Sequence, residues 1–163
     1  MDLINRLLAH VDLSKDENHQ KEDIKILDPC AGNGALGALL RDYGVEVDCF
    51  ELNAQNSQYL MYHGFIVKGR NFITQEPIPE YDYVIAIPPT ANNVDCGFIT
   101  RMLGWLKPGG KIISFTIPYW TNGIFGNQVE FRRWLNTQNW TLEFIEDGSN
   151  TPKAIIIIHK WEL

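Results

Sequence analysis

The stretch ILDPCAGNGALGALL, residues 26–40, puts a glycine-rich turn between a short apolar strand and a helix-like apolar pattern. Gly32, Gly34 and Gly37 have the spacing G-x-G-x-x-G, in which glycines allow a tight turn and the close approach of a ligand to the backbone. The stretch therefore predicts a ligand-binding turn that opens an α/β unit.

Strand and helix patterns alternate along the rest of the chain. Strands are expected at 24–27, 45–50, 65–68, 81–87, 111–117, 140–147 and 153–160. Helices are expected at 2–12, 35–43, 54–63, 95–106 and 128–138, and a turn at KPGG, 107–110. The last two strands follow each other without a helix, so they form an antiparallel pair. This order predicts an α/β, Rossmann-like doubly wound sheet that is mostly parallel, with an antiparallel final strand.

Length and composition indicate one domain, with an N-terminal helix and polar loop at 1–23 and a Rossmann-like core at 24–163. The N-terminus lacks the features of a signal peptide, no stretch is long enough for a membrane span, and the three cysteines form no disulfide framework, so we expect a cytoplasmic protein. The four histidines are scattered, so we expect no metal site. A net charge of -6 argues against strong autonomous binding to nucleic acid.

Three ligand classes use a turn of this kind: dinucleotides, nucleoside phosphates and S-adenosylmethionine. No G-K-[S/T] follows the glycines, which excludes a P-loop. Glu51, 19 positions after Gly32, would suit the ribose of either remaining cofactor. Asp28 distinguishes them, because a carboxylate facing the ligand opposes a pyrophosphate and attracts an ammonium or sulfonium group. The sequence favours S-adenosylmethionine, and a NAD-binding oxidoreductase remains an alternative.

The motif LDPCAGNGALG closely resembles motif I of the amino-group DNA methyltransferases, which methylate adenine in restriction and modification systems. CFELN resembles the family's acidic second motif, GRNFIT its third, and YDYVIAIPPT the segment with its catalytic Asp/Asn-Pro-Pro-Tyr/Phe. The resemblance covers residues 26–90 and implies a class I methyltransferase fold. It implies that Glu51 holds the ribose hydroxyls, that Leu52 packs beside the adenine and that Asn71 contacts the adenine amine. The implied S-adenosylmethionine site is Asp28, Pro29, Ala31, Gly32, Gly34, Glu51, Leu52, Asn71 and Phe72.

The chain departs from this family at the four-residue catalytic motif, where it has Ile87, Pro88, Pro89 and Thr90. In the family, the polar first residue accepts a hydrogen bond from the target amine and the aromatic last residue stacks on a flipped base. The side chain of Ile87 cannot accept a hydrogen bond, and Thr90 has no ring. Two hypotheses follow: an N-methyltransferase that works mainly by positioning, or a degenerate methyltransferase fold that serves as a binding module in restriction or anti-restriction.

Two further expectations concern partners and nearby loops. A chain of 163 residues has no room for a target-recognition domain, so DNA or a separate DNA-recognition subunit is the expected partner. Asn92, Asn93 and Asp95 are candidate substitutes for the altered motif, although an ordinary loop or helix-cap role is favoured. In the loop PYWTNGIFGN, a role in packing is favoured over a role in ligand contact for the aromatic residues Tyr119, Trp120 and Phe125.

Overall fold

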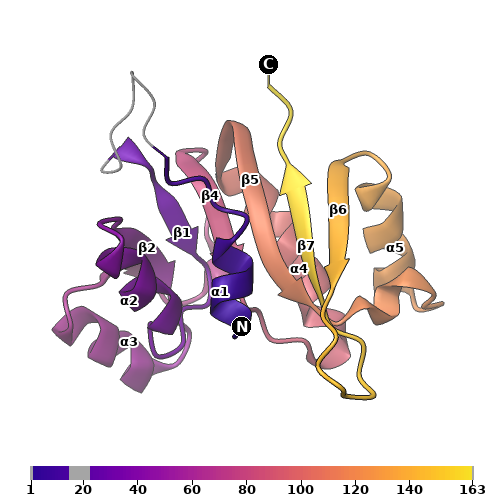
Figure 1. Ribbon diagram of the computed structural model, residues 1–163, viewed down its shortest axis with the longest axis horizontal. Coiled ribbons are helices and arrows are strands. Elements are labelled where there is room, and N and C mark those ends of the chain that lie inside the picture. Colours follow the sequence, from indigo (N-terminus) through magenta and orange to yellow (C-terminus); the bar gives the residue numbers. More distant parts are fainter. Residues whose placement is uncertain (1, 15–22, 163) are drawn as a thin grey trace.

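The computed structural model describes residues 2–14 and 23–162, and these form a seven-stranded sheet with helices on both faces (Figure 1). The strand order is β3-β2-β1-β4-β5-β7-β6. The strands are β1 (Ile26–Asp28), β2 (Val47–Phe50), β3 (Ile66–Gly69), β4 (Tyr81–Ala86), β5 (Leu106–Thr116), β6 (Asn139–Phe144) and β7 (Ala154–His159). The α-helices are α1 (Leu3–Leu8), α2 (Ala35–Asp42), α3 (Ala54–Tyr62), α4 (Val94–Met102) and α5 (Gly126–Leu135).

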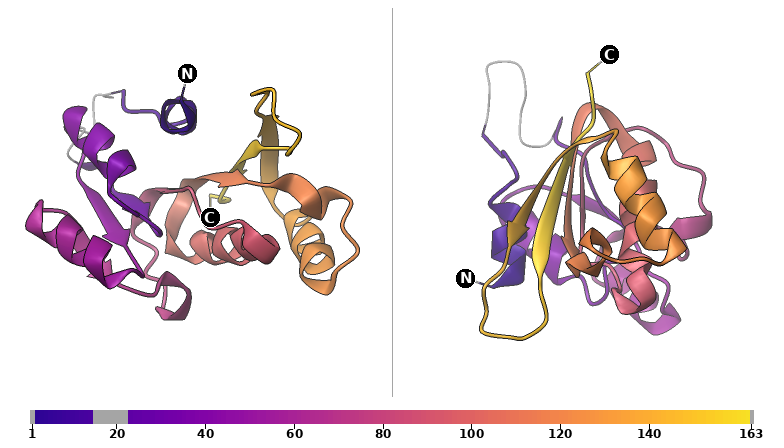
Figure 2. Two further views of the ribbon diagram at one scale, coloured as in Figure 1. Left: turned by 90° about the horizontal axis from the view of Figure 1, so that it is seen from below. Right: turned by 90° about the vertical axis from the view of Figure 1, so that its right-hand side faces the viewer.

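The directions of the strands confirm the predicted fold class. Strands β1 to β5 pair in parallel, whereas β7 is antiparallel to both β5 and β6. The chain leaves β1 toward β2 and β3 and then crosses back to β4 on the other side of β1. In such sheets ligands bind where the strand order reverses, beyond the carboxyl ends of the strands. In Figure 1, β5 points downward, so its carboxyl end is at the bottom. Figure 2 (left) shows the molecule from below and therefore faces that edge.

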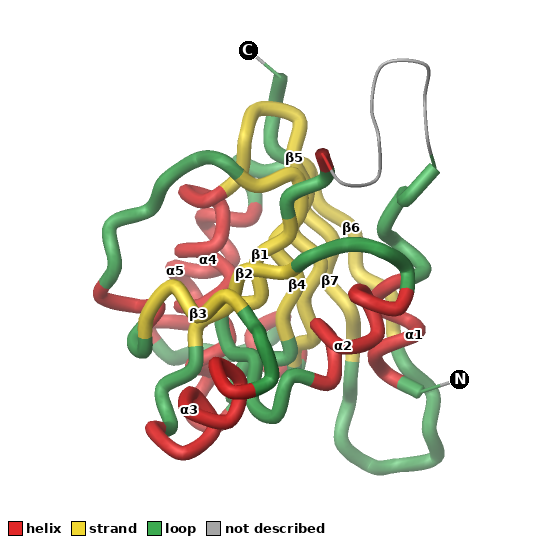
Figure 3. Tube along the Cα trace, turned by 90° about the vertical axis from the view of Figure 1, so that its left-hand side faces the viewer, coloured by secondary structure: helices red, strands yellow, loops and turns green. Residues whose placement is uncertain are grey.

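Two hydrophobic clusters fill the space between the sheet and its helices. Helices α1 and α2 cover one face and α4 and α5 cover the other, while α3 lies near β3 at the end of the sheet (Figure 3). Strand β7 serves both clusters: Ile156 and Ile158 belong to one, and Ile155 and Ile157 to the other. All four are buried, as predicted for a strand covered on both faces. No helix among the described residues is long and apolar enough to cross a membrane.

Several predicted boundaries were wrong. The first helix ends at Leu8 rather than at residue 12, and α4 begins at Val94 and passes into a 3₁₀ turn at Leu103–Trp105. KPGG is not a turn before the strand but part of β5, which starts at Leu106. The four residues form a bulge there, because Tyr81 pairs with Leu106 and Tyr83 already pairs with Lys111. The predicted polar loop after the first helix falls mostly on residues 15–22, outside the described residues.

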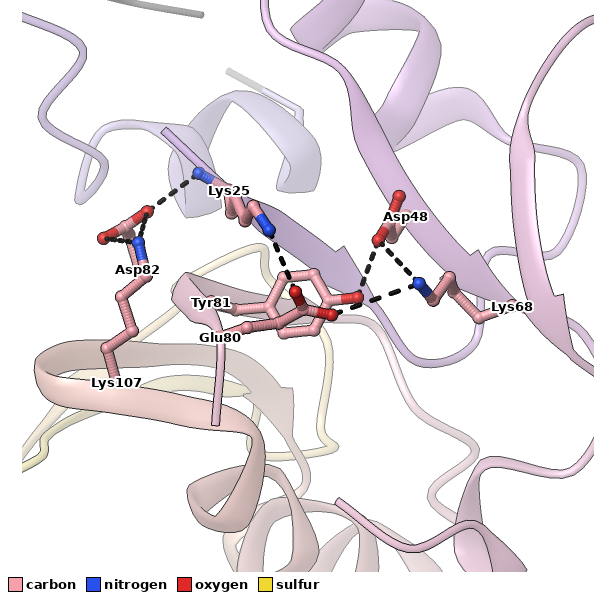
Figure 4. A network of polar contacts seen from close by, with 7 residues as sticks. All are labelled: Lys25, Asp48, Lys68, Glu80, Tyr81, Asp82 and Lys107. Carbon is pink, nitrogen blue, oxygen red and sulfur yellow. Dashed lines mark hydrogen bonds and ion pairs between the residues drawn. The ribbon is translucent and has the colours of Figure 1, made fainter. Parts of the chain in front are cut away.

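A polar network links residues at or just before the starts of β1, β4 and β5 to Asp48 in β2 and Lys68 in β3, toward the edge of the sheet opposite the ligand side (Figure 4). The Tyr81 hydroxyl donates to Asp48 Oδ2 at 2.7 Å, and the Lys68 ammonium lies 3.6 Å from the same oxygen. Lys25 pairs with Glu80 at 2.9 Å. Tyr81 is 1% exposed, so its hydrogen bond to Asp48 is shielded from solvent, whereas the charged side chains of the network are partly exposed.

Replacing Tyr81 with phenylalanine is expected to lower the free energy of unfolding by about 1 kcal/mol, because a net hydrogen bond to Asp48 is lost while the ring packing stays. Urea denaturation measures the change. Tyr62→Phe is the matched control, since Tyr62 is 87% exposed, and it should change stability by less than about 0.5 kcal/mol. Equal effects of the two variants would show that the hydroxyl of Tyr81 contributes nothing specific.

Candidate cofactor site

The glycine turn after β1 adopts a backbone that favours glycine. Gly32 and Gly34 have φ angles of +56° and +82°, in the left-handed region where a side chain is strained. The turn closes with a hydrogen bond from Gly34 N to Ala31 O at 2.8 Å. A second bond, from Ala31 N to Phe50 O at 3.0 Å, attaches it to the end of β2. The turn is therefore held at the carboxyl edge of two neighbouring strands.

The three glycines have different surroundings. A Cβ atom on Gly34 would lie 2.7 Å from Leu60, and one on Gly37 would lie 2.7 Å from Phe65, so these two glycines let α2 pack closely against its neighbours. A Cβ atom on Gly32 would meet no atom within 4 Å. The space above Gly32 is open, and it is there that a ligand can approach the backbone.

Glu51 follows β2 and is bound from both sides. Its Oε2 accepts from Gly32 N and its Oε1 from Asn53 N, both at 2.7 Å. Asn53 in turn caps α3, since its side chain accepts from the backbone of Gln55 and Asn56. Glu51 as a whole residue is 8% exposed. Two short charge-assisted bonds fix its orientation and leave its remaining lone pairs available to a ligand.

Asp28 ends β1 beneath the glycine turn and is 4% exposed. Its Oδ1 accepts a hydrogen bond from Cys30 N at 3.1 Å. The pKa of Asp28 is raised to about 7, mainly by burial; the hydrogen bond from Cys30 N lowers it, and the negative charge of Glu51 adds a smaller increase. A positive ligand group beside this carboxyl would favour its ionised form, whereas an anionic group would disfavour it.

The loops that follow β1 to β4 surround a cavity of about 390 Å³. It is lined by Pro29, Cys30, Glu51, Leu52, Arg70, Asn71, Phe72, Ile73, Ile87, Pro89, Val94 and Phe98. Arg70 donates to Leu52 O from both Nε and Nη2, at 3.1 and 2.6 Å, and Asn71 Oδ1 accepts from Ile73 N at 3.1 Å. These bonds hold the β3 loop against the β2 loop. The cavity is mostly apolar, with an acid at one side.

Comparisons with known proteins support this arrangement at the level of the fold. A scan against protein-family models and a search of curated proteins both return no match. Solved structures do match. A Listeria monocytogenes structure assigned to the class I S-adenosylmethionine-dependent methyltransferases has a TM-score of 0.68 at 15% identity and aligns with 98% of this chain. This chain spans 58% of that protein's length. This chain has the class I methyltransferase fold.

Two further structures with this methyltransferase fold agree. A TehB-like S-adenosylmethionine-dependent methyltransferase from Corynebacterium glutamicum has a TM-score of 0.64 at 15% identity, with 98% of this chain and 89% of that chain covered. Pyrococcus horikoshii TYW2, in complex with MeSAdo, has a TM-score of 0.62 at 14% identity, with 86% of this chain and 58% of that chain covered. The methyltransferase fold is therefore shared over nearly the whole chain.

Within this methyltransferase fold, five of the nine cofactor residues predicted from the sequence line the cavity. Pro29, Glu51, Leu52, Asn71 and Phe72 line the cavity, and Asp28, Ala31 and Gly32 form the end of β1 and the turn beside it. Gly34 lines a separate hollow between α2 and α3. Leu52 is 64% exposed, at the outer wall of the cavity.

The sequence did not identify Cys30, Arg70, Ile73, Val94 and Phe98 as lining residues. Three of them flank predicted motif positions. Val94 and Phe98 are four residues apart on α4, which is the helical spacing for a shared face. Their shared face on the helix that follows Pro88 and Pro89 could have identified these two residues from the sequence.

The altered catalytic motif lies partly on the cavity wall. Ile87 and Pro89 line it, while Pro88 is buried and Thr90 is not among the described lining residues. Ile87 is 37% exposed, so an apolar side chain stands at the motif's first position. Asn92 and Asn93, two and three residues after Thr90, have φ angles of 55° and 58°. Two consecutive left-handed residues other than glycine are strained, and such strain is common at functional sites.

Proposed function

We propose that the chain binds S-adenosylmethionine in the cavity between the glycine turn and the β2 to β4 loops. The observation that carries the proposal is the buried Asp28 carboxyl at the end of β1, four residues before Gly32, where the backbone is open to a ligand. A ligand that brings positive charge to this carboxyl gains stability there, and a pyrophosphate loses it. The methyltransferase fold and the bound MeSAdo in the similar Pyrococcus protein add support for an adenosine-type ligand.

In this proposal each part of the cavity has a separate role. Glu51, oriented by Gly32 N and Asn53 N, accepts from the ribose hydroxyls with its free lone pairs. Leu52, Phe72 and Ile73 supply apolar contacts for the adenine, and Asn71 keeps its amide NH₂ free to donate to a ring nitrogen. Asp28 faces the positively charged methionine portion.

If methyl transfer occurs, the protein contributes chiefly by positioning. When bound, S-adenosylmethionine supplies an electrophilic methyl group on its sulfonium. The loop of Ile87, Pro88, Pro89 and Thr90 would position the acceptor nitrogen beside the bound cofactor, and the apolar side chains of Ile87 and Pro89 on the cavity wall would exclude water. The side chain of Ile87, at the first position of the motif, cannot accept a hydrogen bond from the acceptor amine. The backbone carbonyl groups of the loop take that role.

We further propose a relation to adenine-specific DNA methyltransferases, based on the four motifs between residues 26 and 90. With a net charge of -6, the chain by itself is poorly suited to hold DNA phosphates. A separate DNA-recognition subunit would supply that affinity, and the reaction would take place in the cytoplasm.

The second candidate is a degenerate methyltransferase fold that acts as a binding module in restriction or anti-restriction. Ile87 and Thr90 favour it, because both side chains that act on the target base in the family are absent. Transfer of a labelled methyl group from S-adenosylmethionine to DNA, RNA or a protein extract would exclude this candidate. A catalytically silent chain that still binds the cofactor would support it.

Calorimetric titration of S-adenosylmethionine tests the proposal directly. Glu51→Gln is expected to weaken binding about tenfold, because one charge-assisted bond to the ribose becomes a neutral one. Glu46→Gln is the matched control on the amino side of β2; Glu46 pairs with Arg41 at 3.5 Å, and this change should leave binding unaltered. Tight binding of NAD with none of S-adenosylmethionine would overturn the proposal and favour an oxidoreductase.

A further inference from the structure

The loop after β5 presents aromatic and apolar side chains to solvent at the carboxyl edge. Between Pro118 and Phe125, Tyr119 is 55% exposed, Ile124 is 85% exposed and Phe125 is 68% exposed. Trp120, in the same loop, is 1% exposed. The prediction that packing dominates therefore holds for Trp120 alone. An exposed aromatic ring offers a large planar apolar surface for contact with a ligand.

The buried side chain of Gln128 connects Phe125 to Asn93, in the segment that follows Ile87, Pro88, Pro89 and Thr90. Gln128 is 4% exposed; its Oε1 accepts from Phe125 N at 3.2 Å and its Nε2 donates to Asn93 Oδ1 at 3.2 Å. Asn127 Nδ2 adds a contact to Asn92 O at 3.4 Å. The backbone of Phe125 is thus two hydrogen bonds away from a residue that lies three positions after Thr90.

The loop is anchored to the core by polar groups. Trp120 Nε1 donates to Thr116 Oγ1 at 3.0 Å, and that hydroxyl donates to Asp95 Oδ2 at 2.6 Å. Arg132 donates to Gly123 O at 2.7 Å and also to Trp120 O. Asp95, considered from the sequence as a substitute for the altered motif, is fully buried in this network. It therefore positions the loop from below.

These anchors have a consequence for recognition. Because the backbone of this loop is already fixed at several points, binding through the exposed ring does not carry the cost of ordering the loop. Among the described residues, the hydrogen bonds of Phe125 use its backbone, as a donor to Gln128 Oε1 and as an acceptor for Gln128 N and Val129 N. The ring itself is left for contact with a ligand.

We propose that Phe125 supplies the ring surface that Thr90 lacks, and that it stacks on the planar ring that carries the acceptor nitrogen. The inference rests on the proposed function, under which that ring is a nucleobase. An unsubstituted phenyl surface accepts any base, because every base has a π face. In this proposal, the loop after β5 provides the stacking ring that the four-residue motif provides in the family.

A single-stranded oligonucleotide with one 2-aminopurine tests the proposal, because stacking changes the fluorescence of this adenine analogue. The titration is done with wild-type protein, Phe125→Leu, Phe125→Tyr and Ile124→Ala, each saturated with S-adenosylhomocysteine. Phe125→Leu keeps apolar volume but has no π face, and it is expected to weaken binding about fivefold or more. Phe125→Tyr keeps the ring and Ile124→Ala removes an even more exposed apolar side chain, so both should stay within about twofold of wild type.

Three results would overturn the proposal: no fluorescence change with wild type, equal binding by wild type and Phe125→Leu, or equal losses in Phe125→Leu and Ile124→Ala. Calorimetry of S-adenosylmethionine on the same variants separates the two proposals. Unchanged cofactor affinity together with loss of stacking supports Phe125 as the stacking residue. Absence of cofactor binding in all proteins refutes the proposed function, while a Phe125-dependent stacking signal would still establish the recognition surface.

Discussion

Replacing Asp28 with asparagine is expected to raise the free energy of unfolding at pH 8 by up to about 4 kcal/mol, since each unit of pKa shift corresponds to about 1.4 kcal/mol. Burial raises the pKa of Asp28 from 3.8 to about 7 in the folded protein. The folded state therefore holds a proton that the unfolded state releases between about pH 4 and pH 7. Stability of the wild type falls as pH rises through that window and levels off above it. Asparagine carries no charge to bury at any pH.

The expected signature is a difference between the two proteins that is small at pH 4 and grows until pH 7. Chemical denaturation at pH 4, 5, 6, 7 and 8 measures it, and other titrating groups cancel in the difference. Asp42→Asn is the control, because this exposed residue at the end of α2 should change stability by less than about 0.5 kcal/mol throughout. A constant difference for Asp28→Asn across the range would mean that the carboxyl is not buried as described.

The unit around Asp28 was predictable from sequence because its determinants are local. Strand residues 26–28, the left-handed glycines and the amphipathic α2 are adjacent in the chain, and each selects one backbone conformation. The antiparallel β6–β7 pair follows in the same way from the absence of a helix between two strands. The position of β7 between β5 and β6 did not follow, because strand order depends on contacts between distant segments.

The KPGG bulge shows why turn residues alone did not define the start of β5. Pro108 and Gly109 suit a turn, and Gly109 has a φ angle of +77°. The pairing of β4 with β5 nevertheless extends to Leu106, so these residues are accommodated within a strand. Sequence reasoning weighs local preference, whereas the sheet decides where pairing ends.

The candidate site was predictable only in part, for the same physical reason. Glu51 could be identified because it directly follows β2, and Asn71 because GRNFIT resembles the family's third motif. Arg70, Val94 and Phe98 reach the cavity from loops and from a helix face, and only the folded arrangement brings them there. The pKa of Asp28 likewise depends on how completely the surrounding chain excludes water.

Binding of S-adenosylmethionine is expected to strengthen about tenfold for each pH unit between pH 5 and pH 7, and to level off above pH 7. In the free protein the Asp28 carboxyl is mostly protonated below its pKa of about 7. The cationic methionine portion binds best to the ionised form, so below pH 7 the release of this proton opposes binding. Titration calorimetry at pH 5, 6, 7 and 7.5 measures the affinity, and buffers with different ionisation enthalpies count the proton released.

Asp28→Asn separates this cause from other titrations in the site. The variant is expected to bind about 10- to 100-fold more weakly at pH 7.5, because a bond between two charged groups becomes one between a charge and a neutral amide. Its affinity should also be independent of pH between 5 and 7, with no proton released. The same replacement thus stabilises the free protein and weakens cofactor binding, as expected where a buried charge is retained for function rather than stability. A variant that kept the pH dependence of the wild type would show that another group controls it, and would remove Asp28 from the proposed site.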